Sequence, residues 1–271
     1  MREDWLRFCR AVAADVEDML RRFPTRDDRE PVVGQGEGGD DTTVIDREAE
    51  AAAVARLEEL AGRGISFRLV SEELGERTFG DGDSPWVVVV DPIDGSLNAK
   101  RGLPFFCLSI AIADGPTLDD VRFAFVRDLA GGEEWVAERG RGATVGGRPL
   151  GGVRPKQRLG VVDVEATNAG LLADAAARLD GSVGRIRVLG ALALALCQLA
   201  DGRVDGVATL KPSRSVDLAA AALVVREAGS AFRTLGVDPL PLGLSARAHA
   251  VAARDTAMCD RLAGLLHPAA I

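Results

Sequence analysis

The chain has few of the residues on which disulfide-bonded, zinc-binding or membrane-spanning proteins depend. Four cysteines occur in 271 residues, at Cys9, Cys107, Cys197 and Cys259. They form no Cys-x-x-Cys pair, which argues against a disulfide scaffold or structural zinc site and favours the reducing cytoplasm. No apolar run is long enough to cross a bilayer, and charges throughout residues 1–20 exclude a signal peptide. Tyrosine is absent and three lysines stand against 30 arginines, a bias that we attribute to genome composition.

Positive charge is also in deficit, with 33 basic against 41 acidic residues and a net charge of −8. An acidic chain is a poor general binder of nucleic acid or anionic membrane, so we expect neither as a partner. The same charge suits the capture of divalent cations. An apolar content of 47% with 27% charged residues is near the globular average and excludes disordered, collagenous and coiled-coil proteins.

Hydrophobic periodicity predicts two halves of different character. The first half should contain an amphipathic helix at 2–22 and a second helix at 44–61, separated by a flexible glycine-rich stretch at 31–43. Its remaining apolar runs predict a largely antiparallel sheet with strands at 65–70, 86–90, 103–113, 121–126, 133–138 and 143–145, and a turn within 76–85.

Strands and helices alternate in the second half, which predicts an α/β layer. Its strands should lie at 159–164, 185–189, 204–210, 232–235 and 248–252, and its helices at 169–179, 191–200, 217–228 and 254–266. We therefore predict an α/β protein with an α+β lobe over residues 1–152 and an α/β lobe over residues 153–271.

The most informative motif is the run Asp-Pro-Ile-Asp-Gly-Ser at residues 91–96, directly after an apolar strand. The carboxylates of Asp91 and Asp94 at the end of a buried strand can hold a hard cation. Pro92 fixes the backbone and Gly95 allows close approach of the chain to a ligand. Taken alone, the motif is equally typical of a turn with an aspartate helix cap.

Four further acids are candidate functional residues, although an ordinary structural role would also explain each of them. Glu72 and Glu73 follow the 65–70 strand, where adjacent acids are usually a solvated edge. Asp217 stands at the start of a predicted helix, where an acid stabilises the helix dipole. Asp46 is equally typical of an acid on the exposed face of a helix.

Taken together, these motifs resemble those of the inositol monophosphatase family. The resemblance rests on SEELGE at 71–76, WVVVVDPIDGSLNAKRGLPFFCLSIA at 86–111 and SVDLAAAALVVREAG at 215–229, and extends to TTVID at 42–46. The superfamily also holds fructose-1,6-bisphosphatases and phosphatases of phosphorylated adenosine nucleotides. The resemblance implies a layered αβαβα fold and a cytoplasmic, homodimeric, magnesium-dependent phosphomonoesterase.

It also implies two to three Mg²⁺ ions in each active site. Glu72 and Asp91, with the Ile93 carbonyl, would hold the first ion. Asp91, Asp94 and Asp217 would hold the second, and a third would share Glu72. All of these are oxygen ligands, which Mg²⁺ prefers.

The resemblance assigns the next residues to the phosphate and to water. The amides of Gly95 and Ser96, beside Asp94, would bind the phosphate. The Ser96 hydroxyl, paired with Asp46, would help to activate the attacking water, which makes Asp46, Ser96, Glu72 and Asp94 the expected catalytic residues.

The sequence indicates the substrate-binding residues less clearly than the metal ligands. Gly190 and Ala191 stand where family members line the sugar or inositol pocket, and Arg187 is expected to reach it. Lys211 and Arg214 are cations suited to a second phosphate, although surface cations are an equally good reading. We therefore expect a small phosphorylated sugar or polyol as substrate, namely inositol monophosphate, fructose 1,6-bisphosphate or both. The alternatives are 3′-phosphoadenosine 5′-phosphate and a non-catalytic regulatory role.

Overall fold

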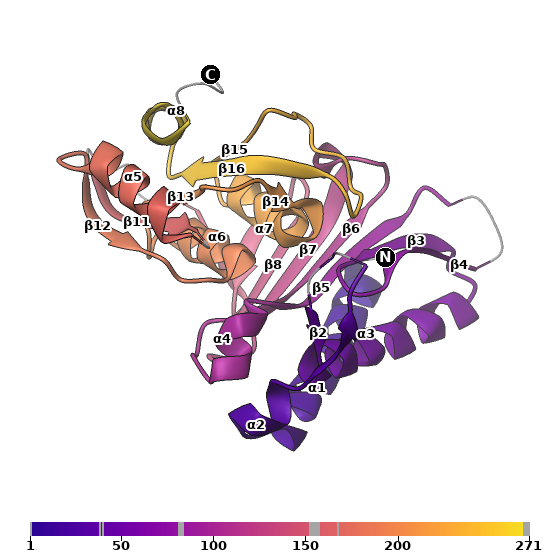
Figure 1. Ribbon diagram of the computed structural model, residues 1–271. Coiled ribbons are helices and arrows are strands. Elements are labelled where there is room, and N and C mark those ends of the chain that lie inside the picture. Colours follow the sequence, from indigo (N-terminus) through magenta and orange to yellow (C-terminus); the bar gives the residue numbers. More distant parts are fainter. Residues whose placement is uncertain are drawn as a thin grey trace.

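The computed structural model describes residues 2–37, 39, 41–80, 84–151, 158–166 and 168–267. Five layers of secondary structure follow one another through the molecule (Figure 1), in the order helices, sheet, helices, sheet, helices. The predicted α/β class and layered αβαβα arrangement are confirmed. The predicted lobe boundary at residues 152 and 153 lies outside the described residues, so the division into lobes stays a prediction.

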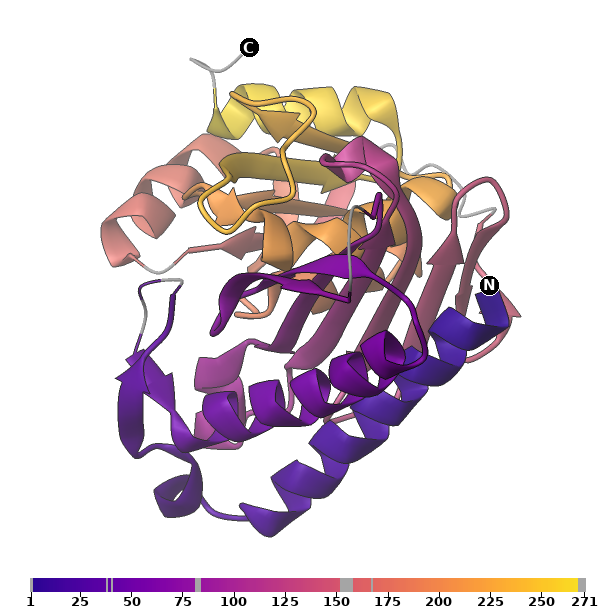
Figure 2. The same ribbon diagram turned by 90° about the vertical axis from the view of Figure 1, so that its right-hand side faces the viewer.

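The outermost layer consists of α1 (Arg2–Arg22) and α3 (Val44–Gly62), which lie side by side across one face of the first sheet (Figure 2). In α1, Cys9, Val12, Val16 and Met19 are fully buried. Their spacing places them on one helical face, which is why the sequence predicts this helix correctly.

The first sheet has eight strands in the order β10-β9-β8-β7-β6-β5-β3-β4. Their bounds are β3 (Phe67–Ser71), β4 (Gly75–Phe79), β5 (Val87–Asp94), β6 (Cys107–Ala113), β7 (Val121–Asp128), β8 (Glu134–Glu138), β9 (Gly142–Val145) and β10 (Arg148–Pro149). β3 and β5 are parallel and the other neighbours are antiparallel. All eight residues of β5 are buried because helices cover both faces of the sheet there.

The central layer is formed by α6 (Leu192–Ala200) and α7 (Ser215–Glu227), which lie between the two sheets. α6 is rich in Ala and Leu and α7 in Ala, Leu and Val, and their buried side chains form one core with residues of both sheets. The residues before and after residue 152 therefore share a hydrophobic core.

The second sheet has the strand order β12-β11-β13-β16-β14, with β15 also paired to β16. Its bounds are β11 (Leu159–Glu165), β12 (Val183–Arg187), β13 (Gly206–Thr209), β14 (Ser213–Arg214), β15 (Ala231–Leu235) and β16 (Arg247–Ala253). The last layer, α5 (Ala169–Leu179) and α8 (Thr256–Leu266), packs on its outer face.

Some local predictions are wrong. The stretch 31–43, expected to be flexible, contains the antiparallel strands β1 (Val32–Gln35) and β2 (Asp41–Thr43), preceded by α2 (Arg26–Arg29). The strand expected from residue 103 starts only at Cys107, as β6. The edge strand β4 occupies the start of 76–85, and the turn predicted at 80–85 includes residues 81–83, which lie outside the described residues. Among the described residues, no helix is long and apolar enough to span a bilayer.

Candidate active site

Three carboxylates from three separate elements meet where β3 and β5 end. Glu72 follows β3, Asp91 lies in β5, and Asp217 stands in the first turn of α7. One carboxylate oxygen of each lies within 4.8 Å of the others. Because β3 and β5 are parallel, their carboxyl ends lie at the same edge of the sheet, which brings Glu72 beside Asp91. An all-oxygen donor set of this kind fits a magnesium ion.

Asp91 and Asp94 are both buried, and the register of β5 against β6 shifts between them. The Asp91 Oδ1 atom accepts a hydrogen bond of 3.1 Å from the Ile93 amide. The Asp94 Oδ2 atom accepts one of 2.7 Å from the amide of Ala193 in α6. The motif is therefore the end of a bulged strand whose second carboxylate is fixed by the central helix layer.

The acids raise one another's pKa values. Burial and the charge of Asp217 raise the pKa of Asp94 to about 8, with smaller contributions from Glu165 and Glu72. Burial, followed by the charge of Glu72, raises the pKa of Asp91 well above its ordinary value. Several negative charges compete in one buried volume, which is the electrostatic setting that a divalent cation relieves.

Arg214 lies among these acids. Its Nη1 atom is 2.6 Å from Glu72 Oε1, and its Nη2 atom is 3.3 Å from Asp217 Oδ1. Its backbone amide also donates to Asp217 Oδ2 at 3.0 Å. The guanidinium thus ion-pairs with two expected metal ligands, whereas the sequence predicts that it faces a second phosphate of the substrate.

A small cavity of about 20 Å³ adjoins the acids. It is lined by Asp46, Glu72, Glu73, Asp91, Pro92, Ile93 and Ser96. Asp46 and Ser96, predicted to act together, therefore lie at the same cavity. The described partners of the Asp46 carboxylate are Thr43 (hydroxyl at 2.6 Å) and Lys100 (Nζ at 2.9 Å) rather than Ser96.

A larger cavity of about 430 Å³ lies on the side of Asp94 and Asp217. Its lining includes the predicted residues Gly190, Lys211 and Arg214, together with Glu165, Ala166, Leu192, Pro212, Ser213 and Arg247. Arg187 and Ala191 are not part of it. Arg187 is exposed on the edge strand β12, and Ala191 is only 1% exposed.

The short helix α4 (Ser96–Arg101) is held against the loop before α6 by two close contacts. Gly95 has φ of +86°, and a Cβ atom there would lie 2.8 Å from the Cβ of Ala191. The side-chain amide of Asn98 donates hydrogen bonds of 2.8 Å to the carbonyls of both Phe105 and Leu189. These contacts fix the 91–96 motif relative to the loop that precedes α6.

The structure adds Lys100, Glu165 and Arg247 to the predicted site residues. Lys100 could have been found from composition, because the chain has only three lysines. Lys100 and Lys211 both lie at the site, and Lys156 falls outside the described residues. Arg247 comes to the site through the pairing of β16 with β14, which no sequence pattern reveals.

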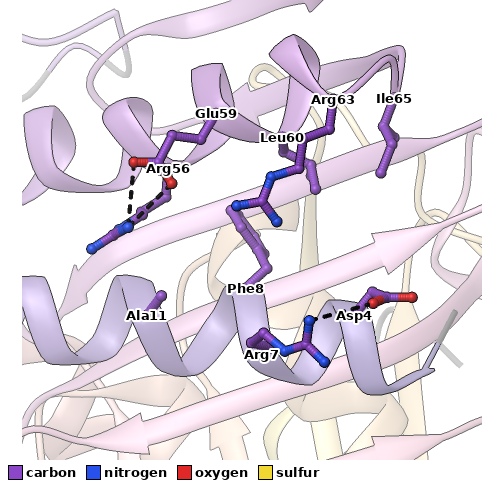
Figure 3. A pocket seen from close by; sticks show the side chains of 9 residues that line it. All are labelled: Asp4, Arg7, Phe8, Ala11, Arg56, Glu59, Leu60, Arg63 and Ile65. Carbon is purple, nitrogen blue, oxygen red and sulfur yellow. Dashed lines mark hydrogen bonds and ion pairs between the residues drawn. The ribbon is translucent and has the colours of Figure 1, made fainter.

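Another cavity, of about 270 Å³, lies between α1 and the end of α3 (Figure 3). Phe8, Leu60 and Ile65 contribute its apolar lining. Each of its two acids faces an arginine: Asp4 lies 3.9 Å from Arg7, and Glu59 lies 3.1 Å from Arg56. Three arginines, Arg7, Arg56 and Arg63, line this cavity against two acids, so its lining carries a net positive charge and does not fit a cation site.

Comparison with known proteins agrees with the geometry of the site. The family model "Inositol monophosphatase family" matches residues 3–267. A fructose-1,6-bisphosphatase/inositol-1-monophosphatase of Methanothermobacter thermautotrophicus is 32% identical over 93% of this chain and 92% of the relative. One with the same name from Methanocaldococcus jannaschii is 28% identical over 97% of this chain and 99% of the relative. A solved inositol monophosphatase–fructose 1,6-bisphosphatase superposes with a TM-score of 0.81 at 27% identity, covering 97% of this chain and 99% of the other. The chain therefore belongs to the inositol monophosphatase family of metal-dependent phosphatases.

Proposed function

We propose that this protein is a Mg²⁺-dependent phosphomonoesterase that hydrolyses inositol monophosphate, fructose 1,6-bisphosphate or both. The observation that carries the proposal is the meeting of Glu72, Asp91 and Asp217 beside a cavity of about 430 Å³. That volume lies within the range of small-molecule binding sites. The family shown by the comparisons supplies the reaction class.

The oxygen ligands would be divided between two principal ions. Glu72, Asp91 and the Ile93 carbonyl would hold one, and Asp91, Asp94 and Asp217 the other. When bound, such ions lower the pKa of water and stabilise the leaving oxygen of the ester. A third ion, sharing Glu72, would balance charge once the phosphate is bound.

The small and large cavities suggest different tasks. A cavity of about 20 Å³ holds about one water molecule. In the proposed reaction, Asp46 and Ser96 orient that water, and Lys100 balances the charge of Asp46. Asp94, Gly95 and Ser96 hold the phosphate, and the alcohol leaves toward the larger cavity.

The larger cavity supports a substrate that carries hydroxyls or a second phosphate. Lys211 and Arg247 lie on its wall. Arg214 also lines it but is ion-paired to the acids, so Lys211 and Arg247 are the better candidates for a second phosphate. Every predicted acidic ligand is present, which gives no support to a non-catalytic role. The homodimer and the cytoplasmic location remain predictions.

Phosphate release from a panel of esters tests the proposal. The panel is inositol 1-phosphate, fructose 1,6-bisphosphate, fructose 6-phosphate and 3′-phosphoadenosine 5′-phosphate, each with Mg²⁺ and with EDTA. We expect Mg²⁺-dependent release from one or both of the first two. Preference for the adenosine compound would replace the proposed substrate, and release in EDTA would contradict the metal dependence.

A further inference from the structure

The large cavity contains a carboxylate that the proposed metal and phosphate chemistry does not use. Glu165 is the last residue of β11 and lines the cavity together with Asp94 and Asp217. In the parallel pairing of β11 with β13 it stands opposite Thr209, and its carbonyl accepts a hydrogen bond of 3.0 Å from Leu210. Glu165 is therefore fixed beside residues 210–212, which connect β13 to β14, on the wall where the alcohol part of a substrate would lie.

One oxygen of the Glu165 carboxylate is already oriented by the protein. The Oε1 atom accepts a hydrogen bond of 2.9 Å from the amide of Gly190. Two residues earlier on β11, the carboxyl of Asp163 accepts one of 3.1 Å from the amide of Leu189. The loop before α6 is thus held by two acids, and Glu165 is a preorganised group rather than a mobile surface side chain.

The two acids differ in exposure. Asp163 is completely buried, whereas Glu165 is half-buried at the cavity. Burial and the neighbouring charge of Glu165 raise the pKa of Asp163 to about 9. Glu165 is therefore the member of the pair that faces the cavity.

A carboxylate accepts hydrogen bonds and donates none, so its ligand must carry a donor. An uncharged donor suits this cavity best, because its lining is charge-balanced, with Asp94, Glu165 and Asp217 set against Lys211, Arg214 and Arg247. An alcohol hydroxyl satisfies both conditions. A second phosphate, by contrast, would be repelled by Glu165 and would suit Lys211 and Arg247.

We propose that Glu165 is a specificity-determining residue that binds a free hydroxyl group on the alcohol part of the substrate. The proposal rests on the proposed phosphatase function and narrows its substrate class. The substrate is a phosphate ester of a polyol or sugar with a hydroxyl near the scissile phosphate, and esters without hydroxyls are selected against.

The test compares inositol 1-phosphate with phenyl phosphate, whose ring carries no hydroxyl group. The variant is Glu165→Gln, because the amide oxygen of glutamine can still accept the bond from Gly190. A hydrogen bond to a charged group corresponds to about a tenfold change or more. We expect the ratio of kcat/KM for inositol 1-phosphate to that for phenyl phosphate to fall about tenfold, mainly through KM for inositol 1-phosphate.

Glu227→Gln is the matched control, because that carboxylate also accepts backbone hydrogen bonds, from Gly140 and Gly142 at 2.9 and 2.8 Å, outside the cavity. Its ratio should equal that of the wild type. A parallel loss on both esters in Glu165→Gln, or an unchanged ratio, would overturn the role of Glu165. If the wild type hydrolyses neither of these esters nor fructose 1,6-bisphosphate, the proposed function itself fails, and this proposal fails with it.

Discussion

The guanidinium of Arg214 lies 2.6 Å from the carboxylate of Glu72, measured between Nη1 and Oε1. This contact connects the start of α7 to the end of β3, and the same guanidinium also pairs with Asp217. Both acids belong to the group of three whose oxygens lie within 4.8 Å of one another. Arg214 therefore competes for the oxygens that a metal ion would bind.

Replacing Arg214 should separate the stability of the metal-free protein from its affinity for Mg²⁺. Removing one partner from a fully buried ion pair costs about 3 kcal/mol or more, and because the Arg214–Glu72 pair is only partly buried, we expect a cost of about 1–3 kcal/mol. Arg214→Gln should therefore lower the free energy of unfolding in EDTA by about that amount. Without the competing cation, the Mg²⁺ concentration at half-saturation should fall about tenfold, read from the rise of Tm with Mg²⁺.

Arg247→Gln is the control for this prediction. Arg247 lines the same large cavity, but its side chain donates to the carbonyl of Leu244 at 2.7 Å. Its Mg²⁺ midpoint should match that of the wild type. An unchanged or higher midpoint in Arg214→Gln would show that the arginine does not compete with the ion.

The close approach of Gly95 to the loop before α6 can be tested with a pair of glycines. Gly95 and Gly102 flank α4, with φ of +86° and +72°. An added Cβ meets Ala191 at 2.8 Å at the first position and nothing within 4 Å at the second. Both alanine variants incur the cost of positive φ, about 1–2 kcal/mol. Gly95→Ala should lose about 2 kcal/mol more, as measured by urea denaturation, and equal losses would contradict the packing.

A buried acid beneath the site predicts how stability depends on pH. Glu50 on α3 is 4% exposed, and the Ser71 hydroxyl oxygen lies 2.7 Å from both of its carboxylate oxygens. Burial raises the pKa of Glu50 from 4.5 to about 7. Between these values the folded protein binds more protons than the unfolded chain, so the free energy of unfolding falls as pH rises.

Glu50→Gln removes that titration and keeps the shape of the side chain. Relative to the wild type, the variant should gain about 3 kcal/mol between pH 4.5 and pH 8, since each pKa unit corresponds to about 1.4 kcal/mol. Denaturant titrations of both proteins at the two pH values measure the gain. A difference between the proteins that stays constant with pH would rule out a buried titrating Glu50.

Helices and strands could be predicted from the sequence where one face of the element is buried, or where the whole element is buried. The apolar face of α1 and the buried run of β5 are regular patterns that allow few alternatives. β1 is exposed throughout, its two valines included, and the middle of β4 is exposed and polar, so no alternation of buried and exposed residues marks them as strands. β4 is an edge strand, where polar residues are tolerated.

The residues of the site could also be predicted from the sequence only in part. The 91–96 motif and the acids Glu72 and Asp217 could be selected from residue type and resemblance. The ion pair of Arg214 could not, because it depends on how α7 meets the end of β3. Glu165 was missed because a single acid at the end of a predicted strand resembles any exposed acid until the fold places it beside Gly190.

The most direct test of the central claim is phosphate release by the wild type and Asp94→Asn at saturating Mg²⁺. Asparagine keeps an oxygen that can accept the hydrogen bond from Ala193, so Tm should change little. Loss of a charged ligand from a two-metal site should lower kcat about 100-fold or more, corresponding to several kcal/mol of transition-state stabilisation. We predict this loss on inositol 1-phosphate or fructose 1,6-bisphosphate, together with complete loss of wild-type activity in EDTA. Activity of Asp94→Asn within a few fold of the wild type would contradict the two-metal account.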